Sequence, residues 1–133
     1  VYPLVDSVFI GSCTNGRIDD LRTAARILSG RKLHRGTRLL ITPSSRRTLM
    51  EAAKDGTLNA LLLSGASVTP PGCGVCFGAL GGVPADGENI VTSTNRNFKA
   101  RTGNPEARTY LASPAVCAAT ALKGVISDPS EYL

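Results

Sequence analysis

Short apolar runs alternate with amphipathic segments along the first part of the chain. The run at residues 7–10 predicts a strand, and it ends at a glycine. Residues 19–28 then predict a helix, because their apolar side chains recur at helical spacing and Gly30 is placed to terminate it. These apolar positions are Leu21, Ala24, Ala25 and Leu28. Residues 7–28 therefore predict a strand, a loop and a helix, in that order.

The same order is repeated in the next thirty residues. Residues 37–41 predict a strand, and residues 49–53 predict a helix that Ser44 or Ser45 caps. We interpret the arginines beside these serines as charged surface. Residues 58–63 are strongly apolar, but so short a run fits either a helix or a buried strand.

Glycine and proline dominate the middle of the chain, where residues 65–82 predict a long, ordered loop. A β-rich run follows at residues 90–93. Near the end, Ser113 and the proline after it predict a helix start, and residues 115–122 continue that helix as far as Gly124.

Strands that alternate with helices predict an α/β domain with a mainly parallel sheet and helices on its faces, a three-layer α/β/α arrangement. The 133 residues suffice for a single domain that spans the whole chain, 1–133. Ligands of such sheets sit at the carboxyl ends of strands, in the loops that lead into helices.

Three of the four cysteines lie in glycine-containing loops of this kind. Cys13 belongs to the sequence SCTNGR at residues 12–17, and Cys73 and Cys76 form a Cys-Gly-Val-Cys motif. Structural zinc sites and electron-transfer clusters normally take four protein ligands, so three thiolates leave one position open. We hypothesise a 4Fe-4S cluster whose fourth iron binds substrate and acts as a Lewis acid in dehydration.

Other uses of these cysteines remain as alternatives. A thioredoxin-like redox pair would need the Cys-x-x-Cys motif at a helix start, whereas Pro-Pro-Gly precedes it here. A zinc site would need Cys117, but that residue lies in an apolar helix and is expected to belong to the core. No secretion signal precedes the first strand, so we expect reduced thiols and a cytoplasmic location.

The net charge of +5 comes mostly from arginine. Three tyrosines and three phenylalanines do not alternate with basic residues, so a nucleic-acid partner is not expected, and no stretch is apolar enough for a membrane span. Asn95, Arg96 and Arg101 follow the run at residues 90–93 and suit a small dicarboxylate, because arginine pairs with carboxylates through two hydrogen bonds. His34, the single histidine, is interpreted as solvated surface.

Four motifs resemble, in the same order, those of the aconitase superfamily. They are IGSCTNGR at residues 10–17, PGCGVC at 71–76, STNRNFKAR at 93–101 and LASP at 111–114. The resemblance is to the large subunits of 3-isopropylmalate dehydratase and homoaconitase. It covers almost the whole chain. Val75 and Ala100 depart from the usual proline and glycine of the family, without removing a functional group.

The resemblance implies the fold of the aconitase iron-sulfur domain and a set of site residues. Cys13, Cys73 and Cys76 would be the ligands of a 4Fe-4S cluster. Asn95 would lie beside the cluster, and Arg96 and Arg101 would contact a substrate carboxylate.

The same resemblance implies that the chain corresponds to the C-terminal third of a large subunit. The remaining domains and a small swivelling subunit would be its partners and would supply the catalytic base, so no catalytic residue is assigned here. The implied reaction is dehydration and rehydration of 2-isopropylmalate to 3-isopropylmalate in leucine biosynthesis. Other 2-hydroxy di- or tricarboxylates, as in homoaconitase or aconitase, are alternative substrates. A non-enzymatic metal-binding or redox domain is the alternative from another class.

Overall fold

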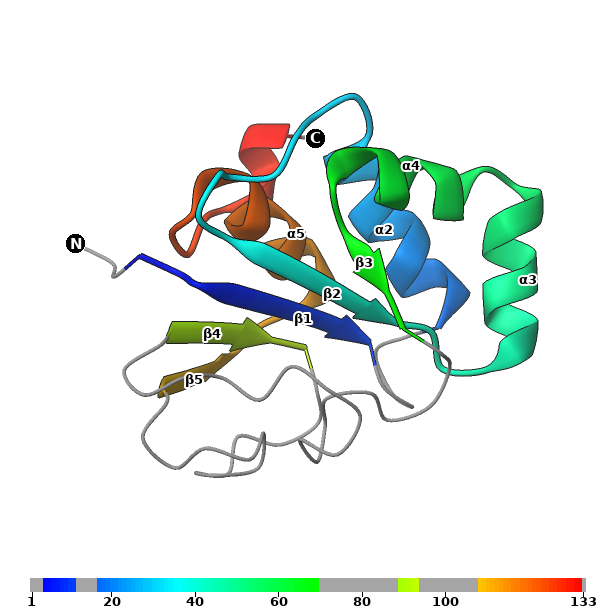
Figure 1. The fold of residues 1–133 in the computed structure, drawn as a ribbon, viewed down its shortest axis with the longest axis horizontal. Coiled ribbons are helices and arrows are strands. Elements are labelled where there is room, and N and C mark those ends of the chain that lie inside the picture. The colour runs from blue at the N-terminus through cyan, green and yellow to red at the C-terminus, as the bar shows by residue number, and fades with distance from the viewer. Residues whose placement is uncertain (1–3, 12–16, 70–88, 94–107, 133) are drawn as a thin grey trace.

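Parallel strands form the centre of the structure (Figure 1). The computed structural model describes residues 4–11, 17–69, 89–93 and 108–132. The strands are β1 (Ser7–Gly11), β2 (Arg38–Thr42), β3 (Ser67–Val68), β4 (Asn89–Thr92) and β5 (Arg108–Leu111). The helices are α2 (Ile18–Leu28), α3 (Arg46–Lys54), α4 (Thr57–Ser64), α5 (Pro114–Lys123) and the 3-10 helix η2 (Pro129–Tyr132). The predicted α/β class is confirmed.

The strand order is β3-β2-β1-β4-β5, and every pair in it is parallel. The chain moves outward from β1 to β2 and β3, and later strands then add on the opposite side of β1. β1 pairs with β2 from Ser7↔Arg38 to Gly11↔Thr42, and it pairs with β4 as far as Phe9↔Thr92. The strand order therefore reverses between β1 and β4.

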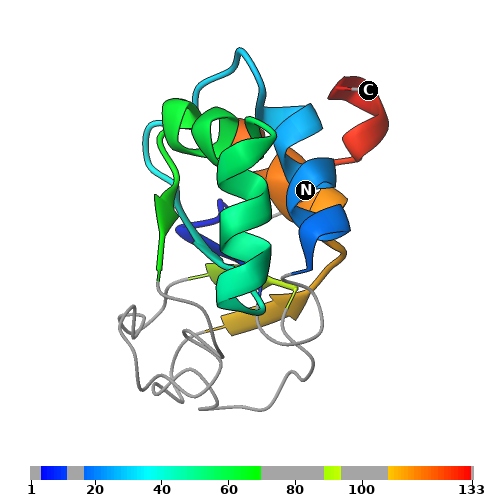
Figure 2. The ribbon, with the colours of Figure 1, turned by 90° about the vertical axis from the view of Figure 1, so that its right-hand side faces the viewer.

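The described helices pack against one face of the sheet. Val8 and Ile10 point to this face and join the main hydrophobic core, whereas Phe9 between them belongs to a small cluster on the other face. Helices α2 and α5 lie side by side against the sheet (Figures 1 and 2). The second helical layer of the expected three-layer arrangement would fall outside the described residues and stays a prediction.

The ends of the helices follow the signals in the sequence. Ser45 caps α3 by accepting a hydrogen bond from the N–H of Thr48, and Ser113 caps α5 in the same way. Gly30 and Gly124 follow α2 and α5 with positive φ, as predicted. The apolar run left open between helix and strand is helix α4.

Two strands are not indicated by the hydrophobic pattern. β3 lies inside the segment 65–82, which was expected to be a loop, and β5 precedes the last helix without a strong apolar run. β3 has only two residues and is held by backbone pairing with Leu40 and Ile41, so no side-chain periodicity marks it. β5 extends the other side of the sheet by pairing with all of β4.

His34 has a structural contact that its exposure conceals. Its backbone N–H donates to the carbonyl of Ala121, and its ring lies where a side chain at Gly124 would be, because a Cβ there would come within 2.7 Å of the ring. The Gly124 carbonyl in turn accepts from the N–H of Val5. His34 is exposed, as the sequence predicts, and it also makes this structural contact. His34 joins the α2–β2 connection to the end of α5.

None of the described helices has the length and apolar character needed to cross a membrane.

A polar contact joins α2 to the turn between α3 and α4. The Nε atom of Arg22 lies 2.8 Å from Oδ2 of Asp55, whose Oδ1 accepts from the N–H of Thr57. Hydrogen bonds from the hydroxyl and backbone of Thr57, followed by the bond from Arg22, lower the pKa of Asp55 from 3.8 to about 2. The folded state therefore favours the ionised carboxylate.

We expect Asp55→Asn to lower the thermal unfolding midpoint at neutral pH. Because the folded-state pKa is lowered, the carboxylate stabilises the fold fully above 3.8 and loses this effect as the pH falls towards about 2. The difference between variant and wild type should shrink over that range, as followed by circular dichroism. Asp19→Asn is the control, because the exposed Asp19 carboxylate lies 3.7 Å from Arg22 and should contribute little. A constant difference down to pH 2 would contradict this assignment.

Candidate functional site

The segments that carry the predicted site residues begin where strands end. Residues 12–16 follow β1, residues 70–88 follow the end of β3, and residues 94–107 follow the end of β4. Cys13, Cys73, Cys76, Asn95, Arg96 and Arg101 belong to these segments. All six lie outside the described residues, so their positions stay predictions. The strand ends that precede them belong to the described residues and define the candidate site.

These strand ends lie at one edge of the sheet, because all its strands are parallel. We call it the carboxyl edge; it comprises Gly11, Thr42, Thr69 and Ser93 at the ends of β1, β2, β3 and β4. The arrowheads in Figure 1 point to it. It includes the place where the strand order reverses, between β1 and β4. Ligands of open α/β sheets bind at this position.

Hydrogen bonds connect the neighbouring strand ends. The Gly11 N–H donates to the Ser93 hydroxyl at 3.1 Å, which joins β1 to the end of β4. The hydroxyls of Thr42 and Thr69 lie 2.5 Å apart, which joins β2 to the end of β3. Three of these four residues are buried, and Thr69 is partly buried. The starting points of the three segments are thus fixed relative to one another.

Gly11 completes this connection by its lack of a side chain. Its φ is +140°, and a Cβ would lie 2.1 Å from the Thr42 carbonyl oxygen. No other residue fits there, because backbone rather than a flexible side chain occupies the space. The glycine of the sequence IGSC therefore allows β1 and β2 to approach closely two residues before Cys13.

Two helices begin beside the carboxyl edge, and described residues stabilise their first turns. The carboxylate of Asp20 accepts from the N–H of Arg17 at the start of α2, and Ser45 caps α3. Arg47 forms an ion pair with Glu51, with 3.5 Å between Nε and Oε1. The interpretation of Ser45 and its arginines as a capped, charged helix start is confirmed.

Cys117 lies in the core, as the sequence predicts. It is fully buried on α5, and its Sγ is 3.9 Å from the carbonyl oxygen of Ala112. Burial raises the pKa of the Cys117 thiol well above its usual value, which disfavours the thiolate that a metal requires. Within the described ranges, no three His, Cys, Asp or Glu side chains could hold a metal together.

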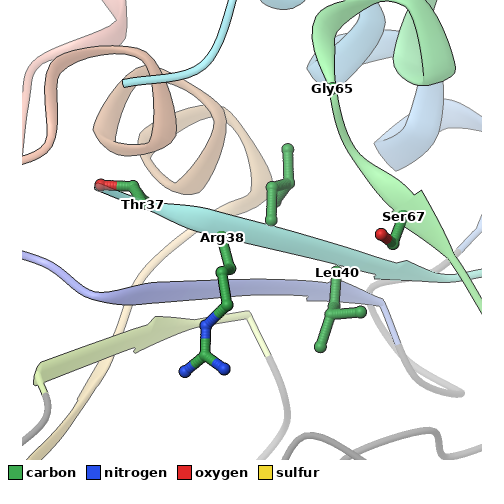
Figure 3. Close-up of a pocket in the computed structure, with 6 residues that line it drawn as sticks. Thr37, Arg38, Leu40, Gly65 and Ser67 are labelled. Atoms are coloured by element: carbon green, nitrogen blue, oxygen red, sulfur yellow. The ribbon is translucent and has the colours of Figure 1, made fainter. Parts of the chain in front are cut away.

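A hollow of about 400 Å³ lies elsewhere, at the beginnings of β2 and β3 (Figure 3). Its lining consists of Thr37, Arg38, Leu39, Leu40, Gly65 and Ser67. The guanidinium of Arg38 donates to the Ser7 hydroxyl at 2.7 Å. The segments with the predicted site residues follow the ends of β1, β3 and β4, whereas this hollow lies at the beginnings of β2 and β3. The candidate site is therefore the carboxyl edge and not this hollow.

Residues 3–124 match the aconitase family (aconitate hydratase), and the chain belongs to this family. It is 51% identical to the 3-isopropylmalate dehydratase large subunit 2 of Archaeoglobus fulgidus over 129 residues, 97% of this chain and 31% of that protein. It is 54% identical to the 3-isopropylmalate dehydratase large subunit of Elusimicrobium minutum, over the same shares of each. It is 55% identical to the homoaconitase large subunit of Thermus thermophilus, over 96% of this chain and 30% of that protein. The chain therefore spans about a third of the length of these curated relatives.

The sequence did not reveal the hydrogen bond between Gly11 and Ser93. Both residues stand in motifs, but 82 positions separate them. The available signal was a hydroxyl residue directly after the last residue of a strand, which occurs at Ser93. Only the strand order shows that this hydroxyl meets the end of β1.

Gly11→Ala is expected to destabilise the fold by about 3 kcal/mol or more, because it combines an unfavourable φ with a clash against backbone. Gly30→Ala is the matched control: its φ is +74°, and nothing lies within 4 Å of an added Cβ. We expect the control to lose only about 1–2 kcal/mol. Urea unfolding of both variants measures the difference, and equal losses would show that the contact at Gly11 relaxes.

We expect Cys117 to resist iodoacetamide in the folded chain and to react only after denaturation, because its thiol is buried and its pKa is raised. In the metal-free protein, the three predicted ligand cysteines should react first. Peptide mass spectrometry after timed labelling distinguishes the four thiols. Labelling of Cys117 at the rate of the others would contradict its placement in the core.

Proposed function

We propose that this chain forms the single, C-terminal iron-sulfur domain of a hydro-lyase large subunit that converts 2-isopropylmalate to 3-isopropylmalate. The observation that carries the proposal is the carboxyl edge. Three segments with the cysteines and arginines of the family motifs begin there, at strand ends joined by hydrogen bonds. Membership of the aconitase family and relatives bearing the dehydratase name support the reaction class.

The residues fit a 4Fe-4S cluster with one iron free of protein thiolate. Cys13, Cys73 and Cys76 supply three soft ligands, and the buried Cys117 is not suited to be the fourth. When bound, such a cluster supplies Lewis-acid chemistry to a hydroxyl group that leaves as water. The glycines near these cysteines in the sequence would allow backbone N–H groups to approach the sulfurs closely.

Binding and orientation of the substrate are the roles that we assign to this chain. Arg96 and Arg101 would each pair with a carboxylate through two hydrogen bonds, and Asn95 would offer an amide to the substrate hydroxyl region. A substrate with two carboxylates and a hydroxyl matches this set. The proton-transferring groups would come from the remaining domains and a small subunit, since the relatives are named large subunits.

Homoaconitase is the second candidate function. The Thermus thermophilus relative of that name is as similar to this chain as the dehydratases are. Both substrates carry the hydroxyl and carboxylates that Arg96 and Arg101 would bind, so these residues do not separate them. We favour isopropylmalate because most of the similar relatives bear the dehydratase name. We place the protein in the cytoplasm, because free thiolate ligands require a reducing compartment.

Anaerobic reconstitution with iron and sulfide tests the proposal. We expect about four irons and four sulfides per chain, because three thiolates suffice for the cluster. Cys13→Ser should lose most of this iron, while Cys117→Ser should retain it and serves as the matched control. A plain Cys-x-x-Cys redox or zinc domain would not depend on Cys13. Equal metal content in both variants, or zinc in place of iron, would contradict the proposal.

The substrate is tested by electron paramagnetic resonance of the reduced, reconstituted chain. Addition of 3-isopropylmalate should shift the signal, and homocitrate should do so less. The reverse order would favour the homoaconitase alternative. We expect no measurable hydratase turnover from the chain alone, because the proton-transferring groups would come from the remaining domains and a small subunit. Turnover would show that the chain supplies its own proton-transferring groups.

A further inference from the structure

We propose that Ser93 is a positioning residue of the cluster site, whose hydroxyl holds the end of β1 and thereby the direction of the segment with Cys13. This inference rests on the proposed function and extends it to a residue outside the predicted set of cluster ligands and substrate contacts. The observation is the hydrogen bond from the Gly11 N–H to the Ser93 hydroxyl, which crosses the place where the strand order reverses.

The Ser93 hydroxyl takes the place of a backbone group. β1 and β4 pair as far as Phe9↔Thr92, and the Ser93 N–H donates to the Phe9 carbonyl at 3.0 Å. In a continued parallel ladder, the next bond would run from the Gly11 N–H to the Ser93 carbonyl. Gly11 donates to the Ser93 side chain instead. The ladder between β1 and β4 therefore ends at Phe9↔Thr92, and a side-chain bond joins the two strands beyond it.

This bond lies close in sequence to predicted site residues on both sides, after β1 and after β4. Cys13 is two residues beyond Gly11, and Asn95 is two residues beyond Ser93. Two extended residues span at most about 7 Å, so a change at the bond reaches a predicted ligand and a predicted substrate contact directly. On its other side, Gly11 is fixed by its close approach to Thr42. Ser93 is thus the partner that determines how the end of β1 faces β4.

Burial makes the hydroxyl difficult to replace. Ser93 is 1% exposed, so water has little access to satisfy the Gly11 N–H when the side-chain oxygen is removed. Ser93→Ala should therefore release the end of β1. Ser93→Thr keeps the hydroxyl and should restore the bond.

The test compares Ser93→Ala and Ser93→Thr with Ser64→Ala in the reconstituted chain. Ser64 is a matched control, because it is 2% exposed and its hydroxyl donates to the Leu61 carbonyl at 2.6 Å. Unlike Ser93, it lies before the beginning of a strand, β3, and not after the end of one. Three readings are taken at a temperature where circular dichroism shows every variant folded. They are amide exchange at Gly11, the rate of iron loss to a chelator and the resonance signal of the reduced cluster.

We expect Ser93→Ala to speed exchange at Gly11, to speed iron loss roughly tenfold and to shift the resonance signal, as loss of a group supporting a ligand does. Ser93→Thr should behave as wild type, and Ser64→Ala should leave all three readings unchanged. Iron loss and signal unchanged in Ser93→Ala would overturn the positioning role. So would equal effects of Ser64→Ala, which would indicate general destabilisation.

Failure of the proposed function gives a different result. The wild-type chain would then take up no cluster, whatever residue occupies position 93. The exchange reading still decides the structural part of the proposal in that case. Faster exchange at Gly11 in Ser93→Ala alone would support it, and unchanged exchange would overturn it.

Discussion

The parallel pairing of β1 with β2 and β4 determines where the candidate site can lie. It places the ends of these strands at one edge of the sheet, and the short edge strand β3 joins them through its pairing with β2. Gly11 permits the pairing to continue to the last residue of β1, because any side chain there would meet the Thr42 carbonyl. Every segment with a predicted ligand or substrate contact begins from this edge.

The sequence predicted the elements whose signals are local. The cap at Ser45, the glycine after α5 and the apolar face of α2 are each read from neighbouring residues, and each is confirmed. The sequence did not predict β3, because two residues carry no periodicity. It did not predict the contact of His34 with Gly124, because 90 positions separate the two residues in the chain. The six site residues are predicted from their motifs and from the family resemblance. Their convergence remains a prediction, supported by the strand ends that precede them.

In the proposed function, the chemistry is divided between this chain and the rest of a large subunit with its small subunit. We assign to this chain the thiolates of a cluster and the arginines that would bind carboxylates, whereas its one histidine lies before β2 and packs against Gly124. Relatives about three times as long bear the names of hydro-lyase large subunits. A domain that binds and orients, completed elsewhere by an acid-base group, is consistent with both observations.

The central claim is that three strand ends bring three cysteines to one cluster with an open iron. Mössbauer spectroscopy of the chain reconstituted with ⁵⁷Fe tests it most directly, because it distinguishes one iron from the other three. We expect a 4Fe-4S spectrum in which about a quarter of the iron changes its parameters when 3-isopropylmalate is added. A spectrum of four irons that substrate leaves unchanged, or of a single iron held by sulfur, would contradict it.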